Sequence, residues 1–283
     1  MRHAVLGAGG IGGLIAGALA HSGAEVALLL RPESLSAYAG RLRVESVVLG
    51  DFEVEVPAAP QVEPAVDVLW VAVKAPGLER ALSLVPPESL RKAVVVPLLN
   101  GVDHVDVLRQ RYGKVVAAAI RVESERVAPG LIRQKSPFLR VDMAGAEDVQ
   151  AALGQAGIEC HSQTDEVTVL WEKLVLLAPV ALATTAFDAP LGAVRGEPLF
   201  SGCRAEAAAA AQSAGATIDV DSVRNLHHAV PAEMQSSMQK DVAAGVDPEL
   251  AAIAGPILRL GREKGFSTAS TNELVDKITA RLN

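Results

Sequence analysis

A glycine-rich turn close to the start of the chain constrains the fold more than any other feature of the sequence. Residues 3–6 read His-Ala-Val-Leu, and residues 7–12 read Gly-Ala-Gly-Gly-Ile-Gly. Such spacing permits a tight turn from strand to helix and lets a ligand approach bare backbone. The same spacing also occurs in turns that bind nothing. Its place between a first strand and a helix favours a dinucleotide phosphate held by Gly7, Gly9, Gly10, Ile11 and Gly12.

The remainder of the first half alternates short apolar runs with helical stretches. These runs lie at 3–6, 25–30, 67–73, 93–98 and 114–120, and nearly every position in them is apolar. Strands of this kind are typical of a parallel sheet that is covered by helices on both faces. The pattern predicts an α/β fold with a Rossmann-type, doubly wound parallel sheet.

The pattern changes near the middle of the chain. Residues 121–163 hold alternating segments and one helical stretch, which indicate an antiparallel extension of the first domain. From Asp165 onward the sequence has helical character throughout. We therefore predict a dinucleotide-binding domain over 1–164, with its boundary near Thr164, and an all-helical domain over 165–283, to which the resemblance given below assigns substrate binding and catalysis.

Two helix starts are predicted in the second domain. Asp165 is a good N-cap for the helix that carries Val-Thr-Val-Leu-Trp-Glu-Lys, because its carboxylate can accept from free N–H groups. Ser270 and Glu273 have the spacing of a capping box for the last helix.

Composition excludes several classes of function. The formal net charge is −7 and basic residues do not cluster, so we expect no nucleic-acid partner. The two cysteines, Cys160 and Cys203, indicate neither a disulfide framework nor a zinc site. Histidines 227 and 228 lack a spaced carboxylate, so we interpret them as surface or packing residues and expect no metal.

The sequence predicts a cytoplasmic protein that does not enter a membrane. Met1 is followed at once by a strand, which leaves no room for a signal peptide. The apolar run Leu174–Phe187 is interrupted by Pro179 and is shorter than the roughly 20 residues of a membrane span. We interpret that run as a buried helix.

The end of the second strand bears on the choice of cofactor. An enzyme that uses NAD usually has Asp or Glu there to bind the ribose 2′-hydroxyl, whereas this chain has Arg31. A guanidinium can pair with a 2′-phosphate, and a carboxylate would repel it. NADP(H) is therefore the predicted cofactor, although a solvated loop arginine would look the same.

Three further polar residues are candidates for the chemistry. Lys74 and Asn100 follow the strands at 67–73 and 93–98, at the sheet edge where open α/β folds bind ligands. Lys173 shares a helix face with leucines, so its ammonium lies on an apolar stripe. It either snorkels to solvent or acts on a substrate carbonyl in a cleft.

The ordered set of motifs resembles the ketopantoate reductases, which reduce 2-dehydropantoate to pantoate with NADPH in pantothenate biosynthesis. The resemblance spans nearly the whole chain and rests on GAGGIGG at 7–13, VKAPG at 73–77, LLNGV at 98–102, LWEKL at 170–174, SSMQKD at 236–241 and residues 248–265. It implies that Lys74 lies by the cofactor, that Asn100 contacts substrate and nicotinamide, and that Lys173 and Glu249 are catalytic. Ser237 and Glu249 would line the substrate site. Without it, Ser237 would pass as a surface hydroxyl and Glu249 as a first-turn carboxylate.

Two positions depart from the family pattern. Family members carry asparagines one and two turns after the catalytic lysine, where this chain has Leu177 and Ala181. The resemblance predicts an NADPH-dependent reductase of a small 2-oxo acid, with 2-dehydropantoate or a close analogue as substrate. The alternatives are a reductase of another 2-oxo acid or imine with a more apolar pocket, and a non-catalytic NADP sensor. The apolar second domain also permits a homodimer.

Overall fold

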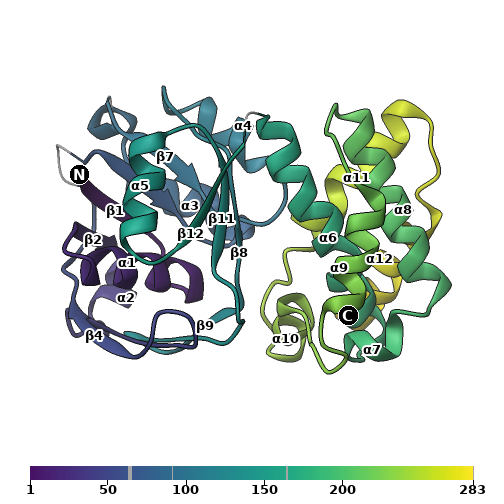
Figure 1. The fold of residues 1–283 in the computed structure, drawn as a ribbon, viewed down its shortest axis with the longest axis horizontal. Coiled ribbons are helices and arrows are strands. Elements are labelled where there is room, and N and C mark those ends of the chain that lie inside the picture. The colour runs from purple at the N-terminus through teal and green to yellow at the C-terminus, as the bar shows by residue number, and fades with distance from the viewer. Residues whose placement is uncertain (63–65, 91, 164, 283) are drawn as a thin grey trace. The chain divides into compact units, whose positions relative to one another are not determined.

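The structure is a computed structural model that describes residues 1–62, 66–90, 92–163 and 165–282. The chain forms two compact units (Figure 1). Unit 1 comprises Met1–Leu99 and His104–Val169, and unit 2 comprises Asn100–Asp103 and Leu170–Asn283. Thr164, the predicted boundary residue, lies outside the described residues.

Unit 1 is built on a parallel sheet with the strand order β5-β2-β1-β6-β7. Its strands are β1 (Arg2–Leu6), β2 (Glu25–Leu29), β5 (Ala58–Ala59), β6 (Val68–Val71) and β7 (Val94–Pro97). The helices of this unit are α1 (Gly10–His21), α2 (Pro32–Leu35), α3 (Leu78–Leu82), α4 (His104–Arg109) and α5 (Glu147–Gln155), with 3₁₀ turns η1 (Ala75–Gly77) and η2 (Pro87–Leu90). The predicted doubly wound parallel sheet is confirmed.

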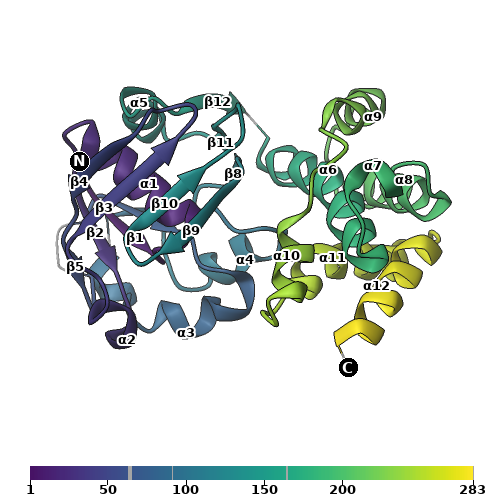
Figure 2. The same ribbon diagram turned by 90° about the horizontal axis from the view of Figure 1, so that it is seen from below.

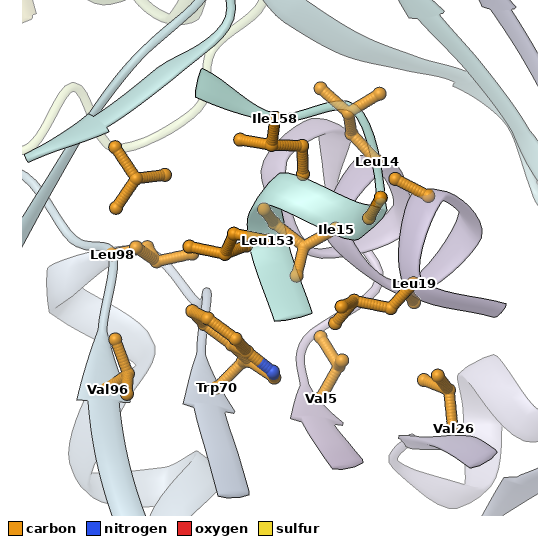
Figure 3. Packing of buried hydrophobic residues seen from close by; sticks show 14 of the residues in the cluster. Val5, Leu14, Ile15, Leu19, Val26, Trp70, Val96, Leu98, Leu153 and Ile158 are labelled. Atoms are coloured by element: carbon orange, nitrogen blue, oxygen red, sulfur yellow. The ribbon is translucent and has the colours of Figure 1, made fainter. Parts of the chain in front are cut away.

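Alternate residues of each strand pack on opposite faces of this sheet, which explains the continuous apolar runs. Val5, Trp70 and Val96 belong to one buried cluster, to which α1 and α5 contribute Ile15 and Leu153 (Figure 3). The intervening strand residues, including Leu6, Leu69 and Val95, belong to a second cluster with Leu78, Leu82 and Leu108 from α3 and α4. The strands β1, β2, β6 and β7 are therefore buried on both sides, whereas the two-residue edge strand β5 is only partly buried.

The run at 114–120 does not extend the main sheet as predicted. Only Val115 makes an isolated parallel bridge, to Val95, and the strand proper is β8 (Ala118–Arg121). It joins a separate sheet with the order β12-β11-β8, formed with β11 (Arg140–Ala144) and β12 (Glu159–Gln163). A second small sheet has the order β4-β3-β10-β9, with β3 (Arg41–Ser46), β4 (Phe52–Glu55), β9 (Ser124–Ala128) and β10 (Leu131–Gln134) (Figure 2).

These small sheets mix antiparallel and parallel pairs, so the predicted antiparallel extension was only half right. β10 pairs antiparallel with β9 but parallel with β3, and β11 pairs antiparallel with β8 but parallel with β12. The alternation of polar and apolar residues indicates a half-exposed strand whichever way its neighbour runs. The sequence pattern could therefore not distinguish the two arrangements.

Unit 2 is all-helical over its described residues, as predicted. Its helices are α6 (Glu166–Phe187, which begins in unit 1), α7 (Leu191–Val194), α8 (Pro198–Ser213), α9 (Val220–Ala229), α10 (Ser237–Ala243), α11 (Leu250–Lys264) and α12 (Ala269–Leu282). α8 packs against both α11 and α12 (Figure 1). Among the described residues α6 alone is long and apolar enough to cross a membrane, yet 72% of its most apolar window is buried within the protein, as in a core helix.

One predicted helix cap is confirmed and the other is wrong. Asp165 accepts hydrogen bonds from the backbone N–H groups of Val167 and Thr168, at 3.1 and 3.2 Å. The hydrogen bond from the Thr168 hydroxyl lowers the pKa of Asp165 further. Ser270 instead lies inside α12, whose first N–H groups donate to the carboxylate of Glu206 on α8. A distant carboxylate thus replaces the local capping box, which no local spacing reveals.

Candidate functional site

The glycine turn owes its shape to three close approaches of backbone. Gly7 follows β1 with φ of +100°, and a Cβ there would lie 2.7 Å from Val73 Cγ1. A Cβ at Gly10 would lie 2.3 Å from the Ser124 carbonyl oxygen, and one at Gly12 would lie 1.8 Å from the Gly7 carbonyl oxygen. Side chains at these positions are therefore excluded by the protein itself.

Gly9 differs from these glycines, because a Cβ at this position would meet nothing within 4 Å. It is the N-cap of α1 and has ordinary extended backbone, without a side-chain hydrogen bond to the helix. The first N–H groups of a helix lack partners within the helix, and the helix dipole favours an anion there. The open space beside Gly9 therefore fits a phosphate group that rests on the start of α1.

Two cationic residues follow the strands on either side of this turn. β2 and β6 both pair with β1, with Leu6 in register with Leu29 and Val71. Arg31 follows β2 as the exposed N-cap of α2, and Lys74 follows β6 as the exposed N-cap of η1. Arg31, the glycine turn and Lys74 thus lie along one edge of the sheet.

Asn100 lies in unit 2, although it comes three residues after β7 in the sequence. Its side-chain amide donates to Oε2 of Glu249 at 3.2 Å. Gly101 follows with φ of +85°, and a Cβ there would lie 2.4 Å from the carbonyl oxygen of Ala252 on α11. The structure therefore brings together two predicted site residues that are 149 positions apart.

Glu249 is buried, with 7% of its surface exposed, and it has a left-handed backbone with φ of +58°. Its N–H donates to Oδ1 of Asp247 at 3.0 Å, and α11 begins at the next residue. A side chain in this conformation costs about 1–3 kcal/mol, and such strain concentrates at functional positions. The protein thus keeps a strained, buried carboxylate against the Asn100 amide.

Lys173 lies on α6 between the buried residues Leu170 and Leu174, and is itself half-buried. The two positions that depart from the family pattern differ from each other in the structure. Leu177, one turn after Lys173, is partly exposed, whereas Ala181 is completely buried. Of these two side chains only Leu177 is accessible to a bound molecule.

Ser237 is exposed at the first position of α10. The preceding residue, Ser236, is 4% exposed and caps this helix by accepting from the Gln239 N–H at 3.1 Å. The hydroxyl groups of Ser236 and Thr184 are 2.7 Å apart, which attaches the start of α10 to α6. Sequence reasoning missed Ser236, although Ser-x-x-Gln is the spacing of a capping box.

The two neighbouring histidines have different environments. His227 is fully buried and its Nε2 lies 2.8 Å from the Leu176 carbonyl oxygen, whereas His228 is exposed. Burial lowers the pKa of His227 to about 4. Of the two roles predicted for this pair, His227 is therefore the packing residue and His228 the surface residue. No group of three metal-ligating side chains occurs within the described part of the chain.

Comparison with known proteins identifies the class of protein to which this chain belongs, and then its family. A model described as "Ketopantoate reductase PanE/ApbA" matches residues 3–147, and its C-terminal counterpart matches residues 167–281. A two-domain oxidoreductase with a Rossmann-type unit and a helical unit is thereby defined. The chain belongs to the ketopantoate reductase family, which confirms the resemblance seen in its motifs and its assignment as an enzyme.

Individual relatives agree over the full length. A protein of Caulobacter vibrioides named 2-dehydropantoate 2-reductase is 28% identical, with 98% of each chain covered. The solved PanE/ApbA family ketopantoate reductase from Ralstonia eutropha JMP134 has a TM-score of 0.89 at 26% identity, covering 100% of this chain and 98% of that one. A D-mandelate dehydrogenase with NADH, at 21% identity and a TM-score of 0.88, covers 100% and 98% and shows the shared fold.

Proposed function

We propose that this chain reduces a 2-oxo acid to the 2-hydroxy acid with NADPH, and that its substrate is 2-dehydropantoate or a close analogue. The observation that carries the proposal is the buried Glu249 carboxylate, paired with Asn100 in the same unit that holds Lys173. A buried carboxylate held by an amide, in a unit that also supplies a half-buried lysine, suits proton transfer to a carbonyl oxygen. The full-length relative named 2-dehydropantoate 2-reductase supports this substrate class.

The cofactor proposal rests on the edge of the main sheet. The glycine turn and the start of α1 would hold the pyrophosphate, and Lys74 would lie beside the cofactor. Arg31 is exposed two residues after β2 and would bind a 2′-phosphate, which favours NADPH over NADH. When bound, the reduced nicotinamide supplies the hydride.

The residues of unit 2 would manage the proton. Lys173 would polarise the oxo group of the substrate and supply a proton as negative charge develops on that oxygen. Glu249 would orient either the Lys173 ammonium or the new hydroxyl group. Asn100 would hold the Glu249 carboxylate and donate to the substrate, and Ser237 would contact the substrate from the start of α10.

The test is NADPH oxidation by the purified full chain with 2-dehydropantoate and a panel of other 2-oxo acids. We expect turnover that falls about 100-fold or more in Lys173→Ala. Lys264→Ala, which removes an exposed lysine at the end of α11, is the matched control and should leave the rate unchanged. A folded Lys173→Ala protein with most of the wild-type activity would contradict the assignment of Lys173.

A second candidate is a reductase of a more apolar 2-oxo acid or imine. The observation that favours it is the partly exposed Leu177, one helical turn from Lys173, at a position where the family pattern has an amide. An aliphatic wall binds a branched apolar side chain but discriminates weakly for a hydroxyl group. Faster turnover of simple branched 2-oxo acids than of 2-dehydropantoate would favour this candidate.

The remaining predictions concern the location and assembly of the protein. A cytoplasmic location stays a prediction, and fractionation of cells that produce the protein at its natural level would test it. A homodimer also stays a prediction. Light scattering on the purified chain would give its mass directly, against 29.4 kDa for one copy.

A further inference from the structure

The segment Asn100–Asp103 is held along α11 at three points. Asn100 donates to Glu249, which directly precedes the helix, and Gly101 packs against the backbone of Ala252. At its other end, Asp103 accepts from both terminal nitrogens of Arg259, at 2.9 and 2.6 Å. The contacts extend over ten residues of sequence from Glu249 to Arg259, or about 15 Å at the rise of an α-helix.

The contact between Asp103 and Arg259 constrains geometry more than it stabilises the fold. A bidentate pairing of guanidinium and carboxylate fixes both the distance and the orientation of the two groups. The Arg259 and Asp103 side chains are 42% and 51% exposed, and ion pairs with such exposure contribute little to the free energy of unfolding. Loss of this pair should therefore loosen the segment without unfolding the protein.

The segment needs such an anchor because it contains a glycine directly after Asn100. Gly101 has a left-handed backbone, so this part of the chain has more conformational freedom than its neighbours when it is not held. The Asn100 amide donates a hydrogen bond to Glu249 from the start of this segment. A second attachment three residues further on restricts the directions in which that amide can point.

We propose that Asp103 and Arg259 are a positioning pair, which holds the segment 100–103 on α11 so that the Asn100 amide meets the Glu249 carboxylate. The pair acts through Asn100 and touches no reacting atom. The inference rests on the proposed function in one respect, because it takes Asn100 and Glu249 as substrate-site residues.

The kinetic test uses the full chain, NADPH and 2-dehydropantoate, or the panel acid that the wild type turns over best. Arg259→Ala and Asp103→Ala should each lower kcat/KM about tenfold, which is ~1.4 kcal/mol of transition-state stabilisation. Arg262→Ala, which removes an exposed arginine three residues later on the same helix, is the matched control and should have no effect. The charge reversal Asp103→Arg with Arg259→Asp should recover part of the loss.

A double substitution separates positioning from general weakening of the fold. Because Arg259 acts through Asn100, adding Arg259→Ala to Asn100→Ala should cause no further loss of kcat/KM. Additive losses, or an Arg259→Ala protein as active as Arg262→Ala, would overturn the proposal.

Hydrogen–deuterium exchange supplies a readout that does not depend on turnover. Amides in residues 98–106 should exchange faster in Arg259→Ala than in the wild type or in Arg262→Ala, while the rest of α11 is unchanged. Unchanged exchange in that peptide would overturn the positioning role. If the wild type reduces no 2-oxo acid but the exchange difference appears, the proposed function fails and the anchoring of the segment stands.

Discussion

The glycine turn in unit 1 and the Asn100–Glu249 pair in unit 2 are specified in different ways. The turn is encoded by six consecutive residues, and contacts within the protein forbid a side chain at Gly7, Gly10 and Gly12. The pair joins residues 149 positions apart, through a side-chain amide and a strained helix start. Backbone sterics within a short segment can be predicted from sequence, whereas a side-chain meeting across the fold requires the structure.

Substitutions at Gly12 and Gly9 should separate the structural role of the turn from its proposed role in NADPH binding. They have the largest expected effect on stability and binding together. Gly12→Ala places a Cβ against the Gly7 carbonyl, so we expect destabilisation on the order of 3 kcal/mol together with loss of NADPH binding. Gly9→Ala meets no protein atom and should keep the melting temperature, while NADPH binds at least about tenfold more weakly. Thermal unfolding and fluorescence titration measure both effects. Unchanged NADPH affinity in Gly9→Ala would place the phosphate elsewhere.

Acidification should destabilise both units, each through one buried histidine. Burial lowers the pKa of His3 in unit 1 and of His227 in unit 2 to about 4, from 6.5. As pH falls, the unfolded chain takes up these protons first. Stability should therefore be complete above about pH 6.5 and fall towards pH 4, by on the order of 3 kcal/mol for each histidine.

Variants that keep the hydrogen bonds of these histidines isolate the effect of protonation. Trp70 Nε1 donates to His3 Nδ1, so His3→Asn retains an acceptor, and His227→Gln retains a donor towards the Leu176 carbonyl. Urea unfolding of each variant between pH 4 and 7 should show a shallower pH dependence than the wild type. Identical slopes would show that neither histidine is responsible.

Substitution of Arg31 tests whether this residue makes the protein prefer NADPH over NADH. Arg31→Ala should weaken NADPH binding about tenfold and leave NADH binding unchanged, because only NADPH carries the 2′-phosphate. Lys114→Ala removes another exposed cation of unit 1 and serves as the control. Equal losses for NADPH and NADH in Arg31→Ala would remove the argument for NADPH.

The smallest effect on ligand preference is expected on α6, where Leu177 and Ala181 should respond differently. Leu177→Asn should raise the preference for 2-dehydropantoate over simple branched 2-oxo acids several-fold, up to about tenfold. Ala181→Asn should instead lower stability by about 2 kcal/mol, because that position is completely buried. Competition assays and urea unfolding measure the two outcomes. A specificity change in Ala181→Asn without loss of stability would mean that both positions contact the substrate.

The sequence was sufficient for the parts of the fold that follow from local periodicity. Four parallel strands of the main sheet, the Asp165 cap and the helical second unit were predicted from apolar spacing and capping chemistry, whereas the two-residue edge strand β5 was not. The small sheets around β8 were not, because a half-exposed strand shows the same alternation in several pairings. The cap of α12 was also mispredicted, since Glu206 supplies it from another helix.

The candidate site likewise has one part that could be predicted from the sequence and one part that required the structure. The glycine turn, Arg31 and Lys74 follow adjacent strands, so their common edge could be deduced from the order of the sheet. Asn100 was selected from its place after a strand and Glu249 from the family resemblance, and only the structure shows that they meet. Arg259 was missed because its role depends on Asp103 in a distant segment, whereas the Ser-x-x-Gln spacing could have identified Ser236 as a helix cap but not its contact with Thr184.

A double-substitution cycle on Asn100→Ala and Glu249→Gln, read out as kcat/KM with NADPH and the best 2-oxo acid, tests the central claim most directly. If the amide and the carboxylate act as one unit on the substrate, each single change should cost about 100-fold and the double variant should lose little more. Additive losses, or single variants with wild-type rates, would show that the pair only supports the fold and that the chemistry lies elsewhere.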